Sequence, residues 1–184
     1  MKRIVDVMGA LFVLALTWPV MLAAALCIKL DSAGPVIFRQ TRLGLDGGQF
    51  AMYKFRSMVA DAERRGGYST ATGDPRITRV GSFIRRTSID ELPQVFNVLK
   101  GDMSIVGPRP DVPGQRSLYT DDDWRARCSV RPGITGLAQA LVRSNASRGQ
   151  RLELDLRYVG ESSLWLDLKI IGWTVARLTG KGSN

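Results

Sequence analysis

The chain has 184 residues, a length that fits one domain with its own hydrophobic core. Its 26 lysines and arginines outnumber 17 acids, and this net charge of +9 favours an anionic partner such as nucleic acid, a lipid headgroup surface or a phosphorylated substrate. The absence of histidine excludes Ser-His and Cys-His nucleophile pairs, and two cysteines are too few for a disulfide framework, which indicates a reducing compartment.

The first predicted element is an apolar helix near the N-terminus. Residues 7–28 carry no charge, and these 22 residues would extend roughly 33 Å as a helix, enough to cross a bilayer core. A buried helix of a soluble protein is rarely this long and apolar on all sides. A cleaved signal peptide is a second alternative, but this stretch is longer than the apolar region of a usual signal peptide. The sequence therefore predicts membrane association.

The flanks of this segment leave two topologies open. Lys2 and Arg3 precede it and further basic residues follow it, so the positive-inside rule finds no asymmetry. Pro19 lies in the middle, where it removes a helical hydrogen bond and favours a kink. These features favour a re-entrant helix over residues 1–30 with both ends cytoplasmic; a spanning, kinked helix is the alternative. Asp6 is expected to pair with Lys2 and Arg3 at headgroup level, or to lie at a solvated helix end.

Residues 31–184 are predicted to form one compact α+β domain, mainly helical, with a short β-hairpin. Residues 36–40 and 50–58 are strand-prone and are separated by the turn-rich sequence GLDGG. Residues 76–101 have apolar residues at helical spacing and end at a glycine, as helices often do. The other expected features are a polar loop at 60–75, a short apolar run stopped by prolines at 102–113, a helix start at 121 followed by a Gly- and Pro-rich loop, and two helical segments between 150 and 180.

Asp90 and Glu91 stand side by side in the sequence TSIDELPQVF, and two interpretations fit them. Ser88 to Glu91 matches a capping box, in which Ser88 is the N-cap residue and Glu91 reaches back to it. Pro93 weakens this interpretation, because it would be the fifth helical residue rather than the first. A helix start also holds a carboxylate ionised beside backbone donors, which suits a nucleophile or a metal ligand.

Several cations are candidates for binding phosphate, although a solvated basic surface would explain any one of them. Lys54 and Arg56 lie on the second predicted strand, and Arg85 lies shortly before the acidic pair. Arg109 lies between two prolines that stiffen its backbone, and Arg131 opens the rigid turn RPGITG. Acids and arginines without histidine fit phosphoryl transfer, with Mg²⁺ held by carboxylate and phosphate oxygens. Nucleic-acid binding is disfavoured, since no aromatic residues interleave with the basic ones.

The order of these motifs resembles a known family. KRIVD, the proline-broken apolar segment, GPVIFRQTRLG, YKFRSM, SIDELPQVFNVLKGDMSIVGPRP, RPGITGLAQ and LDLKI follow one another as in the small monotopic phosphoglycosyl transferases of bacteria. The resemblance covers nearly the whole chain, and the block from Thr87 to Pro110 is the most specific part of it. Larger members carry additional transmembrane helices before this domain, and the chain resembles the minimal form.

The resemblance implies an activity at the cytoplasmic face of the inner membrane. In this family the first acid of the dyad, here Asp90, attacks a UDP-sugar, releases UMP and forms an aspartyl sugar phosphate. Glu91 is the implied Mg²⁺ ligand. Polyprenol phosphate, expected to be undecaprenyl phosphate, then takes the sugar phosphate, as the first membrane step of glycoconjugate or exopolysaccharide assembly. The remaining polar active-site positions of the family fall on Arg109, Lys54, Arg85 and Asp155.

Two departures and two competing functions stay open. Many members have Ser-Pro at the helix break, where this chain has Trp18-Pro19, so Thr17 is expected to make the bond to the backbone. After GITGLAQ the sequence differs from the usual VNGRN, and Arg143 is the expected replacement for the family's arginine. The alternatives are a membrane-anchored phosphatase or nucleotidase, and a basic lipid-surface adaptor without catalysis. The identity of the sugar and the oligomeric state are left open.

Overall fold

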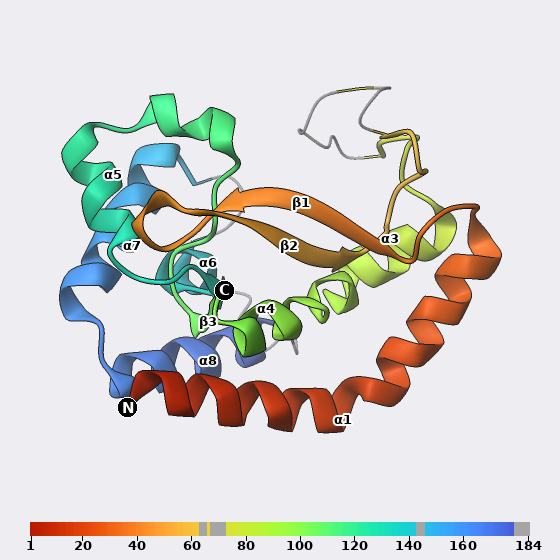
Figure 1. Ribbon diagram of the computed structural model, residues 1–184, viewed down its shortest axis with the longest axis horizontal. Coiled ribbons are helices and arrows are strands. Elements are labelled where there is room, and N and C mark those ends of the chain that lie inside the picture. Colours follow the sequence, from red (N-terminus) through yellow and green to blue (C-terminus); the bar gives the residue numbers. More distant parts are fainter. Residues whose placement is uncertain (63–65, 67–72, 143–145, 179–184) are drawn as a thin grey trace.

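The computed structural model describes residues 1–62, 66, 73–142 and 146–178. It has a long N-terminal helix along one edge, a β-hairpin opposite it, and short helices between and beside them (Figure 1). The elements are α1 (Lys2–Asp31), β1 (Ile37–Leu43), β2 (Gln49–Phe55), α3 (Arg79–Arg86), α4 (Gln94–Lys100), β3 (Ser104–Val106), α5 (Asp121–Cys128), β4 (Gly133–Thr135), α6 (Leu137–Leu141), α7 (Arg148–Glu161) and α8 (Leu164–Leu178). Helix predominates among these residues, as predicted.

The predicted hairpin is confirmed. Strands β1 and β2 pair antiparallel with Ile37 opposite Phe55 and Leu43 opposite Gln49. The connection is tight because Asp46 (φ 53°) and Gly47 (φ 75°) both adopt positive φ, a conformation that glycine takes freely and aspartate tolerates better than most residues. The twist and register of this hairpin determine which side chains of β1 reach the site described below.

The expected helix over 76–101 is interrupted. Helix α3 ends at Arg86, Ser88 adopts a left-handed conformation (φ 57°), and a 3₁₀ turn over Ile89–Glu91 leads into α4. Ser88 makes no side-chain capping hydrogen bond, so the predicted capping box is wrong. Pro93 is instead the residue immediately before α4, where its missing N–H costs no helical hydrogen bond. Gly101 (φ 97°) ends α4, as predicted.

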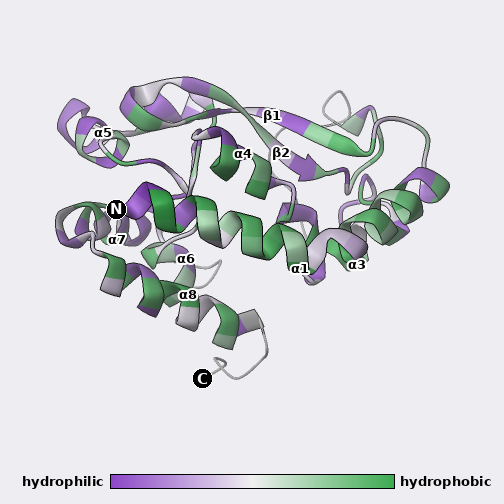
Figure 2. Ribbon diagram, turned by 60° about the horizontal axis from the view of Figure 1, so that its bottom comes forward, coloured by the Kyte–Doolittle hydropathy of each residue, from purple (hydrophilic) through white to green (hydrophobic). Residues whose placement is uncertain are grey.

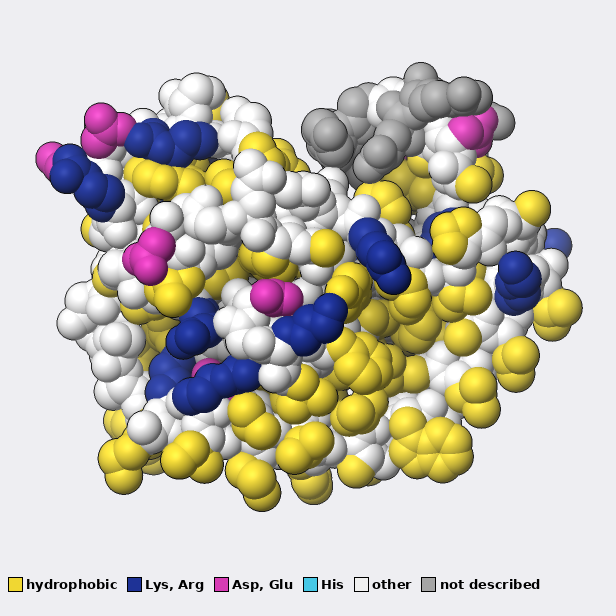
Figure 3. Space-filling model, viewed as in Figure 1, with side chains coloured by type: hydrophobic (Ala, Val, Ile, Leu, Met, Phe, Trp, Pro, Cys, Tyr) yellow, Lys and Arg dark blue, Asp and Glu magenta, His cyan; other side chains and the backbone are white. Residues whose placement is uncertain are grey.

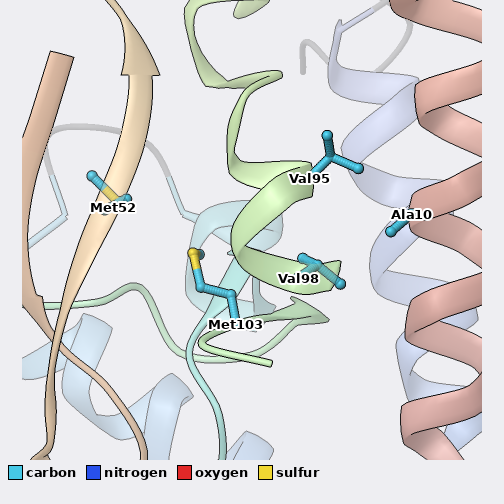
Figure 4. Packing of buried hydrophobic residues seen from close by; sticks show 5 residues of the cluster. All are labelled: Ala10, Met52, Val95, Val98 and Met103. Atoms are coloured by element: carbon cyan, nitrogen blue, oxygen red, sulfur yellow. The ribbon is translucent and has the colours of Figure 1, made fainter. Parts of the chain in front are cut away.

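Helix α4 forms the centre of the core between α1 and β2. Figure 4 shows Val95 and Val98 of α4 near Ala10 of α1, with Met52 of β2 on the other side of the helix. Asn97 is fully buried on the same helix; its side chain accepts from the Tyr53 N–H (2.9 Å) and donates to the Ala51 carbonyl (2.7 Å). A buried amide satisfied in this way fixes the position of α4 against the hairpin.

Strands β3 and β4 form a parallel pair that was not predicted. Ser104 lies opposite Gly133 and Val106 opposite Thr135. Gly133 has no space for a side chain, because a Cβ there would lie 2.1 Å from the Gly107 nitrogen. The expected Gly-rich loop is therefore the place where two backbones approach each other closely. This pairing positions the turn that carries Arg109.

Helix α1 is exposed and apolar over most of its length. It is the one described helix that is long and apolar enough to cross a membrane, and hydrophobic residues predominate along it (Figure 2). Figure 1 shows it changing direction part-way, and Pro19 lies within it. The Thr17 hydroxyl donates to the Val13 carbonyl (2.8 Å), which confirms the expected backbone bond. Its exposed large side chains include Leu11, Phe12, Leu16, Trp18, Leu22 and Leu26.

The N-terminal end of α1 is bound to the domain. Lys2 forms an ion pair with Asp167 of α8, and Arg3 donates to the carbonyls of Val98 (2.6 Å) and Leu99 (3.0 Å). Asp6 is buried and accepts from the Ser104 hydroxyl (2.9 Å) and from the Ile105 N–H (3.0 Å). Its expected pairing with Lys2 and Arg3 is therefore wrong, because all three side chains contact other elements.

The C-terminal end of α1 is bound to the same domain. The buried Arg56 guanidinium donates to the carbonyls of Ser32 (2.6 Å) and Ile28 (3.3 Å) at the end of α1, where carbonyls lack some of their helical partners. Asp31 accepts from the Val80 N–H of α3 (3.1 Å). Both ends of the apolar helix are thus fixed to one folded unit.

Candidate active site

Asp90 and Glu91 lie on the 3₁₀ turn between α3 and α4, facing the hairpin. The Asp90 residue is 8% exposed, whereas Glu91 is partly exposed. The turn is stabilised by backbone bonds from Glu91 N–H to Ser88 and from Leu92 N–H to Ile89. The left-handed Ser88 is an uncommon conformation for a residue with a side chain, and such positions concentrate at functional sites.

Two of the predicted cations converge on Glu91. The Lys54 Nζ lies 2.6 Å from Glu91 Oε1, and the Arg109 Nη2 lies 3.5 Å from the same oxygen. Lys54 comes from β2, Glu91 from the turn, and Arg109 from the loop after β3. The two charges of Lys54 and Arg109 are therefore held next to the acidic pair by three separate parts of the chain.

The environment separates the acidities of the two neighbouring carboxyl groups. Burial raises the pKa of Asp90 above its ordinary value, and the Glu91 charge adds to this, although Lys54 and Arg85 oppose it. Burial also raises the pKa of Glu91, but Lys54 and Arg109 outweigh it, so the net pKa is lowered. Glu91 is thereby held as a paired anion, while Asp90 is a buried, more basic carboxylate.

A cavity of about 1090 Å³ lies beside this pair, lined by the hairpin, the segment after it and the Arg109 loop. Lys54, Arg85, Asp90 and Arg109, all predicted site residues, line it. Six further polar residues that line the cavity were not predicted: Arg39, Gln40, Arg42, Ser57, Arg76 and Gln115. The hairpin register could have found two of these, because residues at every second position of β1 share the face of Lys54. Phe38, the partner of Lys54, is followed on that face by Gln40 and Arg42.

Arg42 is held beside Arg109 within this cavity. Its guanidinium donates to Gln40 Oε1 (3.0 and 2.6 Å) and to the Pro110 carbonyl (2.7 Å). Burial and the Arg109 charge lower the pKa of Arg42 to about 10. Two arginines in such proximity favour a multiply charged anion between them, such as a diphosphate.

Among the other predicted site residues, Arg56 has a structural role, and Arg131 and Asp155 do not line the cavity. The guanidinium of Arg56 reaches the cavity wall but is bonded to the end of α1, so its predicted substrate contact is replaced by a structural one. The Arg131 Nε donates to the Gly101 carbonyl (2.8 Å), and this side chain does not line the cavity. Asp155 is buried and pairs with Arg127, which in turn donates to the Arg109 carbonyl. Arg143 lies outside the described residues.

An apolar groove of about 560 Å³ runs between the second half of α1 and α3. It adjoins the cavity through consecutive residues, because Ile84 and Ile89 line the groove whereas Arg85 and Asp90 line the cavity. Figure 3 shows hydrophobic side chains gathered along the edge of the molecule that α1 occupies. A basic cavity and an apolar groove thus share one wall, the segment that carries the acidic pair.

The donor set is compatible with Mg²⁺. The described residues contain no group of three or more Cys, Asp or Glu side chains placed to hold a metal ion. Mg²⁺, however, is commonly bound through one or two carboxylates together with substrate phosphates and water. Asp90 and Glu91 beside a basic cavity satisfy that requirement.

Comparison with known proteins gives consistent matches over nearly the whole chain. The family model described as bacterial sugar transferase matches residues 1–181. A UDP-glucose:undecaprenyl-phosphate glucose-1-phosphate transferase of Escherichia coli (strain K12) is 45% identical over 95% of this chain and 39% of the relative. An undecaprenyl-phosphate glucose phosphotransferase of Komagataeibacter xylinus is 45% identical over 96% of this chain and 35% of the relative. The chain thus spans less than half the length of these two relatives.

A relative of similar length is also matched. An exopolysaccharide production protein of Rhizobium leguminosarum bv. phaseoli is 45% identical over 99% of this chain and 98% of the relative. The family-model match over residues 1–181 includes the acidic pair and the cations described above.

Proposed function

The chain belongs to the bacterial sugar transferase family, and we propose that it transfers a sugar 1-phosphate from a UDP-sugar to undecaprenyl phosphate or a similar polyprenol phosphate. The observation that carries this proposal is the buried, basic carboxylate of Asp90 beside the Lys54–Glu91–Arg109 cluster, at the wall between a basic cavity and an apolar groove. One substrate of the reaction is a charged diphosphate and the other is a lipid, and the two spaces match these requirements.

In the first half of the proposed reaction, an Asp90 oxygen attacks the β-phosphorus of the UDP-sugar. A bond forms between the carboxylate and phosphorus, the bond from phosphorus to the bridging oxygen breaks, and UMP leaves with the electron pair. Lys54 and Arg109 offset the charge on the phosphate oxygens, which is the main requirement of phosphoryl transfer. The raised pKa of Asp90 makes its ionised form a stronger nucleophile than an exposed carboxylate.

In the second half, a phosphate oxygen of the polyprenol phosphate attacks the same phosphorus. The bond to Asp90 breaks, the carboxylate is restored, and the product is a polyprenol diphosphate sugar. When Mg²⁺ is bound, it would neutralise phosphate charge, and Glu91 would hold it together with phosphate oxygens. The two half-reactions use one site in turn, so the order of events is ping-pong.

The expected result of an assay for UMP distinguishes the functions left open by the sequence. With a UDP-sugar alone, the enzyme will release at most one UMP per active site, whereas adding polyprenol phosphate will give continuous turnover. Complete consumption of the UDP-sugar without a lipid acceptor would identify a hydrolase instead. If no UDP-sugar of a panel gave UMP, with or without acceptor, the result would favour the lipid-surface adaptor without catalysis.

The re-entrant topology is part of the proposal. Lys2 and Arg3 fix one end of α1 to the domain, and Arg56 and Asp31 fix the other end. A helix with both ends on one folded unit does not place them on opposite sides of a bilayer unless one set of contacts breaks. The bend near its middle and its exposed apolar side chains fit insertion from the cytoplasmic face.

Cysteine labelling tests this topology. In a Cys27→Ser background, Ile4→Cys and Ala33→Cys each place an exposed thiol at one end of α1. A membrane-impermeant maleimide will label neither position in intact cells and both in inside-out vesicles. Ser117→Cys, exposed on the domain, is the matched control for the cytoplasmic side. Labelling of either helix end in intact cells would show that α1 spans the membrane.

A further inference from the structure

The side chain of Arg109 is held in place through its backbone. This side chain is half-exposed in the cavity, where it forms a long ion pair with Glu91 (3.5 Å). The loop that carries it is bonded on three sides: Arg42 donates to the Pro110 carbonyl (2.7 Å), Leu43 N–H donates to the Asp111 carbonyl (2.8 Å), and Arg127 donates to the carbonyl of Arg109 itself. The last contact comes from a different part of the chain.

Arg127 is a buried arginine on α5 with three protein partners. Its Nη1 donates to Asp111 Oδ2 (2.6 Å), its Nε donates to Asp155 Oδ2 (3.0 Å), and its Nη2 contacts the Arg109 carbonyl. The guanidinium also lies against the Tyr119 ring, 5.4 Å from the ring centroid. The three hydrogen-bond partners lie on α7 and on the loop after β3, so the guanidinium of Arg127 joins α5, α7 and the Arg109 loop.

Core stability is a poor explanation for such a group. Burying an arginine and two carboxylates requires their desolvation, and replacing buried ion pairs by apolar residues is often neutral or stabilising. Burial is strong enough here to raise the pKa of Asp155 to about 6 against the opposing charge of Arg127. The directional fork of an arginine fixes an orientation that an apolar contact does not.

We propose that Arg127, aligned by Asp155 and Asp111, is a positioning residue that holds Arg109 at the substrate phosphates. This inference rests on the proposed function, because it assigns Arg109 to the UDP-sugar. It also gives Asp155 a role one step removed from the substrate, through Arg127 rather than through direct contact. Displacement of a charged group by about 1 Å can reduce a rate by about 10²-fold, so loosening the loop is expected to reduce catalysis before it unfolds the protein.

A double-mutant cycle tests the inference. Arg127→Met, Arg127→Lys and Asp155→Asn are each made in the wild-type and in the Arg109→Ala background, and the first half-reaction is followed by UMP release. In the wild-type background, each is expected to lower kcat/KM by about ten- to a hundredfold. In the Arg109→Ala background, each will cause less than a twofold further loss, because the group that it positions is already absent.

Folding and function are separated by the controls. Arg125→Met removes an exposed arginine two residues earlier on α5, which contacts Asp121 and Asp122 of the same helix, and it is expected to leave kcat/KM unchanged. Thermal unfolding is measured for every variant, and Asp155→Asn, which keeps the size of the side chain, serves where an Arg127 variant does not fold. Equal losses in both backgrounds would overturn the inference. An inactive wild-type protein would instead contradict the proposed function.

Discussion

Asp90→Asn will abolish sugar-phosphate transfer, with a loss of about 10³-fold or more in UMP release. An amide has no ionised oxygen to attack phosphorus, so no covalent intermediate forms. Intact-mass spectrometry after incubation with a UDP-sugar will show an adduct of one sugar phosphate on the wild-type protein and none on the variant. Substrate binding should persist, because Lys54, Arg85 and Arg109 are unchanged in this variant.

The matched control is Asp46→Asn at the tip of the hairpin. Asp46 is exposed and has a positive φ, a conformation that asparagine tolerates well, so the same chemical change there is expected to leave transfer intact. An adduct that still formed on Asp90→Asn would show that another residue is the nucleophile.

Asp90→Asn is also expected to stabilise the fold at neutral pH without Mg²⁺. The pKa of Asp90 is raised, so the folded protein favours the protonated acid, and ionisation makes the folded state less stable. This destabilisation develops as the pH rises from the pKa of Asp90 in the unfolded chain, near 4, through its higher pKa in the folded protein. Asp90→Asn removes it, and denaturant unfolding at pH 7 and pH 3 should show a gain at pH 7 that disappears at pH 3.

Local sequence was a good guide where one segment determines its own structure. The apolar run of α1, the hairpin around Asp46 and Gly47, and the end of α4 at Gly101 each depend on neighbouring residues. The acidic pair was also found, because adjacent carboxylates near basic residues are visible without knowledge of the fold. Its capping-box interpretation was wrong because Ser88 adopts a left-handed conformation and its side chain makes no capping hydrogen bond.

Contacts between distant segments could not be deduced from single residue types. Lys54 lies on β2 and Arg56 directly follows that strand, yet Arg56 finds its carbonyl partners only because the end of α1 lies beside the hairpin. Asp6 looked like a partner for its neighbours, whereas its acceptor oxygens are used by β3, about 100 residues away. The parallel pairing of β3 and β4 is likewise long-range, and it converts an apparent loop into the support of the Arg109 turn.

Glu91→Gln is expected to reduce transfer by about 10²- to 10³-fold, a range typical for removing one charged group that stabilises the transition state. Glutamine keeps the size of the side chain but loses the charge that orients Lys54 and Arg109 and that would hold Mg²⁺.

The stability of this variant should change in the opposite direction from that of Asp90→Asn. Burial alone would raise the pKa of Glu91, but Lys54 and Arg109 lower it, so ionised Glu91 stabilises the fold above the unfolded pKa, near 4.3. That stability is lost as the pH falls through the folded value. Glu91→Gln will therefore be less stable than wild type at pH 7 without Mg²⁺, and the difference will narrow towards pH 3.

Mg²⁺ supplies the second measurement on the same variant. Wild-type protein will unfold at a higher temperature with millimolar Mg²⁺ and a UDP-sugar than with the UDP-sugar and a chelator, and Glu91→Gln will lose most of this difference. An undiminished Mg²⁺ effect would show that Glu91 is not a metal ligand. Because neighbouring acids with the same function would respond alike, a gain in stability for Asp90→Asn and a loss for Glu91→Gln would separate the nucleophile from the charge that organises its site.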